Sequence, residues 1–233
     1  DNASDHRTED QIATEMCNGA NPAVINVMGG GIRSMNDITH ICLFDIPMLC
    51  SIPGLIYLAP TTCEEYFAML AWAIRQDRKP IALRVPTGGV VHSDAPVDED
   101  YGYRASYRVT HRGSTVAIIA AGSFYQKGET VRALLAEQGI DATLINPRYL
   151  NEVDAETLDS LKPDHRLVVT LEDGCRDGGF GERIAAYYGT SDMKVMVGGV
   201  KKGLYDRYDA QQLMADNRLL DTQIVEDIVR VIG

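Results

Sequence analysis

The sequence predicts an α/β fold made of two doubly wound domains with mainly parallel sheets, of which the first is incomplete. Short runs rich in valine and isoleucine alternate with stretches of helical periodicity, which is the pattern of parallel strands joined by crossover helices. A chain of 233 residues with 45% hydrophobic residues can bury two modest cores. The stretch 86–100 is rich in glycine, proline and acidic residues and indicates a linker. We therefore predict domains at 1–100 and 101–233.

The first domain is expected to run from a polar helix to a βαβ unit. Thr61 or Thr62 is positioned to cap the longest helix, and Glu64 and Glu65 fall in its first turn, where negative charge is favourable. The expected helical segments are 8–17, 44–51 and 62–76, and the expected strands are 23–28, 55–59 and 81–85.

The second domain continues the alternation of strands and helices and is expected to be complete. Three tyrosines at its start, Tyr101, Tyr103 and Tyr107, suggest a strand at an interface. The expected strands are 115–121, 142–146, 166–172 and 193–197, and the expected helices are 125–138, 155–161 and 182–188, followed by two terminal helices.

The net charge of the chain indicates which kinds of partner it can bind. The chain carries 22 basic and 33 acidic residues, a net charge of −11, and no basic block. This balance argues against nucleic acid or an anionic membrane as partner and favours small molecules or proteins. No apolar run approaches the roughly 20 residues of a membrane-spanning helix, and the first residues lack the basic and apolar regions of a signal peptide. We therefore expect a cytoplasmic protein.

The cysteines give no framework for a disulfide or a metal. They are odd in number and form no CxxC pair, so reduced and mostly buried thiols are expected. No metal ligand is predicted in this chain. The five are Cys17, Cys42, Cys50, Cys63 and Cys175.

The segment THICLFDIPMLCSIPGLIYLAP, which begins at Thr39, is the most informative string. By spacing alone it indicates a loop, a buried helical turn and a strand, with His40 at the end of the loop. A lone histidine in such a place is more often structural than catalytic. The string nevertheless resembles the pattern THQGxFDxxxLxxIPNMxxxAP of transketolase-type thiamine-diphosphate enzymes, most closely the 1-deoxy-D-xylulose-5-phosphate synthases. The matched positions are Thr39, His40, Phe44, Asp45, Leu49, Ile52, Pro53, Ala59 and Pro60.

Two further strings extend this resemblance over nearly the whole chain. PIALRVPTG, which begins at Pro80, is similar to the family pattern PxAxRYPRG, and TLEDGCRDGGFGE, which begins at Thr170, resembles TxEEGxxxGGFG. The resemblance implies that the first domain is part of a pyrimidine-binding domain and that the second is a transketolase C-terminal domain.

The resemblance also implies roles for individual residues. His40 occupies the position of the family's histidine near the thiazolium, which donates a proton to a substrate oxygen or stabilises developing charge. Thiamine diphosphate and Mg²⁺ are implied as cofactors, both held largely by residues outside this chain. For Arg84 an ion pair at the strand end is the alternative. The implied cofactor contact is Arg7, and the implied substrate contacts are Asn36 and Arg84. Two further candidates come from the loop after the first strand. Gly30 lies in a glycine run that either lets the backbone approach the cofactor or only turns the chain. Arg33 either supplies a displaced anion contact for a substrate or is a solvated loop arginine.

Several family positions are altered. The glutamate that activates the pyrimidine has no counterpart in 1–22, and the aromatic residue that stacks on the pyrimidine falls at Ser4. Two arginines that clamp a substrate phosphate become Gly29 and Thr87. Since a guanidinium fork matches phosphate oxygens, their loss argues against tight binding of glyceraldehyde 3-phosphate.

The function implied is that of the C-terminal part, or a subunit, of a transferase that moves a two-carbon unit from a keto acid or sugar onto an aldehyde. The alternatives are a β subunit of a 2-oxoacid dehydrogenase-type enzyme and a non-catalytic assembly partner that kept the fold. Part of a pyrimidine-binding domain exposes an apolar sheet face. We therefore expect a homo-oligomer such as a dimer, a separate front-domain chain as partner, or both.

Overall fold

Three parallel strands form the sheet of the first domain. The computed structural model describes residues 9–19, 21–32, 42–85 and 88–233. The strands lie in the order β1-β3-β2, with β3 in the centre and in parallel register with both neighbours. They are β1 (Val24–Val27), β2 (Ile56–Leu58) and β3 (Ile81–Arg84).

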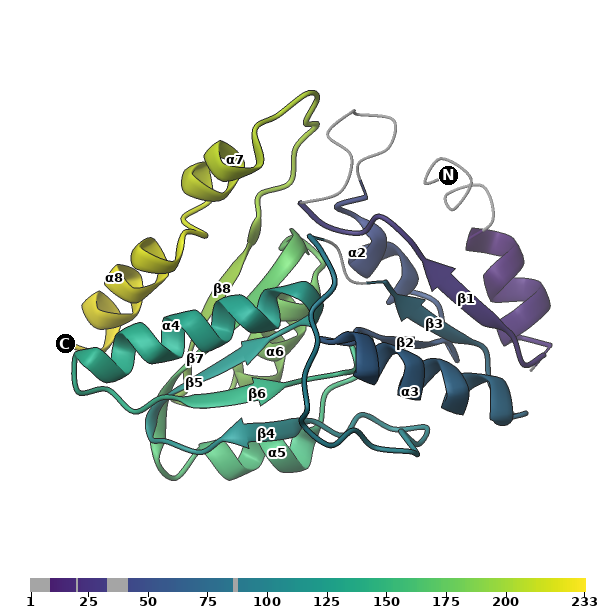
Figure 1. Ribbon diagram of the computed structural model, residues 1–233, viewed down its shortest axis with the longest axis horizontal. Coiled ribbons are helices and arrows are strands. Elements are labelled where there is room, and N and C mark those ends of the chain that lie inside the picture. Colours follow the sequence, from purple (N-terminus) through teal and green to yellow (C-terminus); the bar gives the residue numbers. More distant parts are fainter. Residues whose placement is uncertain (1–8, 20, 33–41, 86–87) are drawn as a thin grey trace.

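Helix α3 (Cys63–Arg75) covers one face of this sheet (Figure 1). Thr62 caps its amino end, because the Thr62 side chain accepts a hydrogen bond from the Glu65 amide at 3.2 Å, as expected of an N-cap. Its buried residues Met69 and Trp72 pack on strand residues such as Ile81. The opposite face contacts the short helix α2 (Asp45–Leu49) and the π-helical turn η1 (Ile12–Cys17).

The second domain is built on five strands in the order β4-β6-β5-β7-β8. All neighbouring pairs are parallel except the edge pair of β4 with β6. The strands are β4 (Arg108–His111), β5 (Thr115–Ala120), β6 (Thr143–Asn146), β7 (His165–Cys175) and β8 (Lys194–Val200).

Helices cover both faces of the second sheet, and the alternation along β5 shows why. Val116 and Ile118 point into one hydrophobic cluster, whereas Ala117 and Ile119 point into another. Successive side chains of a strand lie on opposite faces, so an uninterrupted apolar strand needs cover on both sides. The front layer in Figure 1 is α4 (Tyr125–Glu137), α7 (Ala210–Asp216) and α8 (Asp221–Ile232), and the rear layer is α5 (Ala155–Leu161) and α6 (Phe180–Tyr188).

The two sheets point their carboxyl ends at each other. In Figure 1 the arrows of β1 and β3 point toward the second domain, and those of β5 and β6 point toward the first. A single hydrophobic cluster crosses the junction, because it includes Tyr57 and Ala59 of the first domain and Ile119 and Phe180 of the second. The domains therefore share a core at the edge where parallel sheets usually bind ligands.

Most expected elements agree with the structure to within a few residues, but two features of the second domain differ. No strand includes Tyr101, Tyr103 or Tyr107, so the prediction of a strand there is wrong. Tyr101 and Tyr103 instead place their rings 6.1 and 5.8 Å from that of Trp72 on α3. The edge strand β4 was not predicted. Within the described residues, no helix combines the length and apolar character required to cross a membrane.

Candidate functional site at the junction of the two sheets

Arg84 lies at the centre of the junction. It is the last residue of β3, and its side chain is 5% exposed. Its Nε lies 2.7 Å from Oδ2 of Asp45 on α2, and its Nη1 forms an ion pair with Asp173 on β7. Two hydroxyls join the cluster, since Tyr57 donates to Asp45 at 2.6 Å and Ser123 donates to Asp173 at 2.5 Å. One guanidinium thus joins carboxylates from both domains.

The electrostatics of this cluster favour a permanent positive charge on Arg84. Burial by itself lowers the pKa of Arg84, but the carboxylates of Asp173 and Asp45 outweigh it and hold the pKa well above its usual range. Burial, followed by the charge of Asp45, raises the pKa of Tyr57 well above its ordinary value. Tyr57 therefore remains a neutral hydrogen-bond donor.

The backbone after β1 rests on this cluster. Gly31 donates to the Cys42 carbonyl at 3.0 Å, and Ile32 donates to the Asp173 carbonyl at 3.1 Å. Gly31 has a φ of +99°, and a Cβ there would overlap the Asp173 carboxylate, so the close approach requires glycine. We call residues 29–32 the loop stem, because they lead into the segment that carries His40.

The structure brings together two of the residues singled out from the sequence. A Cβ on Gly30 would lie 2.9 Å from Arg84 Nε, so Gly30 and Arg84 are in direct contact. Arg84 is engaged with Asp45 and Asp173, and its role toward a substrate stays a prediction, as does that of Gly30 toward the cofactor. The remaining predicted site residues lie outside the described residues: Arg7, Arg33, Asn36 and His40.

A further buried carboxyl group, that of Glu172 on β7, lies against the start of α6. Glu172 is fully buried and accepts hydrogen bonds from the backbone amides of Phe180 at 3.1 Å and Gly181 at 2.9 Å. Burial raises the pKa of Glu172 to about 8, although these two amides favour its charged form. The first amides of α6 therefore bind a carboxyl group of the chain itself.

Four residues of the junction were not predicted from the sequence: Asp45, Asp173, Tyr57 and Ser123. A signal was present for two of them, because Asp45 lies inside the matched loop motif and Asp173 follows the matched Glu172. Their convergence on Arg84 depends on the tertiary fold, since they lie 39 and 89 residues from it along the chain.

Comparison with known families assigns both domains. Residues 3–90 match the profile described as "Transketolase, pyrimidine binding domain", and residues 105–216 match "Transketolase, C-terminal domain". The chain belongs to the transketolase family. This membership confirms the resemblance seen in the loop motif.

Curated relatives of this chain include 1-deoxy-D-xylulose-5-phosphate synthases. The synthase of Clostridium acetobutylicum is 33% identical over 205 residues, which cover 87% of this chain and 32% of the relative. That of Crocosphaera subtropica is 31% identical over 227 residues, which cover 95% of this chain and 35% of the relative. The chain thus spans about a third of the length of these relatives.

A solved structure shows the same fold. A chain described as a split-gene transketolase in an inactive β4 tetramer superposes with a TM-score of 0.83 at 20% identity. The superposition covers 97% of this chain and 72% of the other. This transketolase-family chain therefore folds as two α/β domains, as the sequence predicted.

Proposed function

We propose that this chain forms the C-terminal part of a thiamine-diphosphate-dependent transferase, similar to 1-deoxy-D-xylulose-5-phosphate synthase, that moves a two-carbon unit onto an aldehyde. The observation that carries the proposal is the convergence of both carboxyl sheet edges on Arg84, with the loop stem held against it. Parallel α/β sheets bind ligands at this edge. The synthases named above support the reaction type, because they match most of this chain.

In this proposal the bound cofactor supplies the electron sink, and the protein orients the substrate, moves protons and excludes water. His40 donates a proton to a substrate oxygen from the segment that the loop stem introduces. Gly30 lets the backbone approach the cofactor, and Arg84 keeps the loop stem in place through its carboxylate partners. Arg7 contacts the cofactor, and Arg33 and Asn36 contact a keto acid or sugar substrate.

The carboxylates of the junction do not fit a magnesium site. Asp45 and Asp173 both pair with Arg84, so their oxygens already have a cationic partner. Mg²⁺ prefers carboxylate oxygens and waters in an octahedral arrangement. We therefore place Mg²⁺ and the diphosphate on residues outside this chain, which leaves the aminopyrimidine end of the cofactor for the first domain.

The proposed site requires a partner domain. Since the chain spans about a third of its curated relatives, we propose that the remaining part of the site comes from a front domain, on a separate chain or on more of the same protein. The fold neighbour described as a split-gene transketolase provides a precedent for separate chains. Exposed apolar side chains on α3, Phe67 and Ile74, suit a contact in a dimer or larger assembly. A cytoplasmic location is part of this proposal.

A second candidate is a non-catalytic assembly partner. The observations that favour it are the loss of the phosphate arginines at Gly29 and Thr87 and the description of the fold neighbour as inactive. The β subunit of a 2-oxoacid dehydrogenase-type enzyme remains the alternative within the catalytic class, and acyl transfer to a lipoyl domain would identify it.

The test is reconstitution with the protein that copurifies with this chain. Calorimetry with thiamine diphosphate and Mg²⁺ is expected to show heat of binding for the mixture, and product analysis with pyruvate and an aldehyde is expected to show two-carbon transfer. His40→Ala should abolish turnover without changing the melting temperature. Cofactor binding with turnover unaffected by His40→Ala would contradict the catalytic role, and absence of binding would support the assembly partner.

A further inference from the structure

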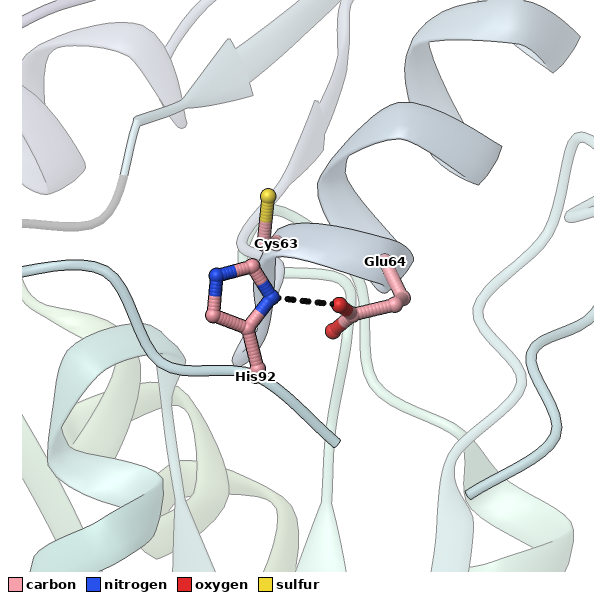
Figure 2. Close-up of side chains that lie close together, drawn as sticks. All are labelled: Cys63, Glu64 and His92. Carbon is pink, nitrogen blue, oxygen red and sulfur yellow. Dashed lines mark hydrogen bonds and ion pairs between the residues drawn. The ribbon is translucent and has the colours of Figure 1, made fainter. Parts of the chain in front are cut away.

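Three side chains at the start of α3 form a cluster of metal-binding type outside the junction. Cys63 and Glu64 are the first two residues of the helix, and His92 approaches them from the linker 86–100. Each contributes one candidate ligand atom, and these atoms lie within 4.8 Å of one another. Figure 2 shows the imidazole next to both the thiol and the carboxylate, with its Nδ1 2.7 Å from Glu64 Oε1.

The backbone holds His92 in this position from both sides. The Val91 carbonyl accepts a hydrogen bond from the Cys63 amide at 2.8 Å, and the Ser93 amide donates to Glu64 Oε2 at 3.0 Å. The two neighbours of His92 are thus hydrogen-bonded to Cys63 and Glu64, which supply the other two candidate ligands. These hydrogen bonds hold the linker against the start of α3 and bring the three candidate ligands together.

The donor atoms of the three side chains, a sulfur, a nitrogen and an oxygen, favour Zn²⁺ over Mg²⁺ and Ca²⁺. A thiolate, an imidazole and a carboxylate together are a set that suits Zn²⁺, whereas Mg²⁺ and Ca²⁺ take oxygen ligands only. Two ligand atoms at about 2.0 Å from a tetrahedral ion are about 3.3 Å apart. The histidine nitrogen and the carboxylate oxygen would therefore move apart by about 0.6 Å from their present hydrogen bond. Such a shift is within reach of exposed side chains.

We propose that Cys63, Glu64 and His92 bind one Zn²⁺ ion, with a water molecule in the fourth position. The site is accessible, because the side chains of His92 and Glu64 are 70% and 37% exposed. The net charge of −11 favours cations. The ion ties the interdomain linker to α3. It is separate from the magnesium of the thiamine cofactor, and it departs from the expectation that the sequence holds no metal ligands.

The experiment is calorimetric titration of zinc into the chelator-treated, reduced chain. One ion per chain is expected, and Co²⁺ in place of zinc should give the near-ultraviolet charge-transfer band of a cobalt thiolate. Cys63→Ser, Glu64→Gln and His92→Ala are each expected to weaken zinc binding by about tenfold or more. Mg²⁺ should not compete.

Two control variants test the specificity of the site. His111 and Asp141 form a histidine–carboxylate pair of the same 2.7 Å length without a thiol, and Cys17 is a partly exposed cysteine elsewhere. His111→Ala and Cys17→Ser should therefore keep wild-type zinc affinity. The proposal is overturned if the wild-type chain binds no zinc, if His92→Ala or Cys63→Ser binds as tightly as wild type, or if the controls lose binding equally. Circular dichroism of His92→Ala confirms folding, since that side chain is exposed.

Discussion

Two clusters of charged side chains lie close together along the chain but differ in burial. One contains Arg84 at the end of β3, and the other contains His92 in the linker. Arg84 and its partners are almost inaccessible to water, whereas His92 and Glu64 are open to it. In the buried cluster an unpaired charge is costly, so the partners are fixed and connect the domains. In the exposed cluster water can replace either partner of the hydrogen bond between His92 and Glu64. That hydrogen bond can therefore break when a metal ion binds. Burial therefore fixes the contacts of Arg84 at the junction, whereas exposure leaves the contact of His92 with Glu64 free to rearrange.

The largest expected effect comes from breaking the buried cluster. Arg84→Met removes the cation that pairs with two buried carboxylates and should lower the free energy of unfolding by about 3–5 kcal/mol. Arg112→Met is the matched control, because Arg112 pairs with Asp164 at 3.2 Å on the surface, with both side chains more than 40% exposed. Arg112→Met should lower the free energy of unfolding by only about 0–1 kcal/mol. Urea denaturation of both variants measures the difference, and equal costs would show that the junction is not a special contact.

A smaller loss is expected when the loop stem is forced away from Asp173. Gly31→Ala combines a left-handed backbone with steric overlap, whereas Gly139→Ala shares a positive φ of +79° but meets no atom within 4 Å. Gly139→Ala should lower the free energy of unfolding by about 1–2 kcal/mol through backbone strain alone. Gly31→Ala should lower it further, because the steric overlap adds to the strain. The melting temperatures of the two variants give the comparison. A Gly31 variant as stable as the Gly139 variant would show that the loop stem is not packed on Asp173.

Glu172 should make stability depend on pH. Its pKa is raised to about 8 in the folded chain from an ordinary value of 4.5, so the folded state binds the proton more tightly. The stability contribution is present in full below pH 4.5 and is lost as the pH rises through 8. The advantage of wild type over Glu172→Gln should therefore shrink by about 1 kcal/mol or more between pH 5 and pH 8. Denaturation curves at both pH values measure it, and an advantage that grows with pH would mean that the carboxylate stays charged.

The smallest effect is expected at the exposed cluster. Without metal, His92→Ala removes one exposed contact and should change the free energy of unfolding by less than about 0.5 kcal/mol. With zinc present at 100 times its dissociation constant, wild type should gain about 2.7 kcal/mol and the variant little. Thermal melts with and without zinc provide the measurement. A large loss in the metal-free variant would place His92 among the structural residues instead.

The parts of the fold that the sequence predicted are those with strong local periodicity. The helix that begins at Thr62 and the apolar strand Thr115–Ala120 follow from capping and from continuous hydrophobic runs. The edge strand Arg108–His111 was missed because it is short, partly exposed and paired on one side only. Periodicity carries no signal for such a strand.

The site was predictable only where a motif contains it. The ion pairs of Arg84 join residues from three elements that lie far apart along the chain, and no local pattern reports such pairing. The cluster of Cys63 and His92 was also missed, since its spacing of 29 residues belongs to no familiar zinc motif and depends on the path of the linker. Family resemblance, by contrast, directed attention to Arg84 and Gly30, which the structure places in contact.

The most direct test of the account is a structure, by electron cryo-microscopy, of the chain in complex with its front domain, with thiamine diphosphate and Mg²⁺ bound. The account predicts cofactor density beside the loop stem at the carboxyl ends of β1 and β3, with Mg²⁺ on residues outside this chain. Density for the cofactor away from this edge, or Mg²⁺ bound by Asp45 or Asp173 in place of Arg84, would contradict it.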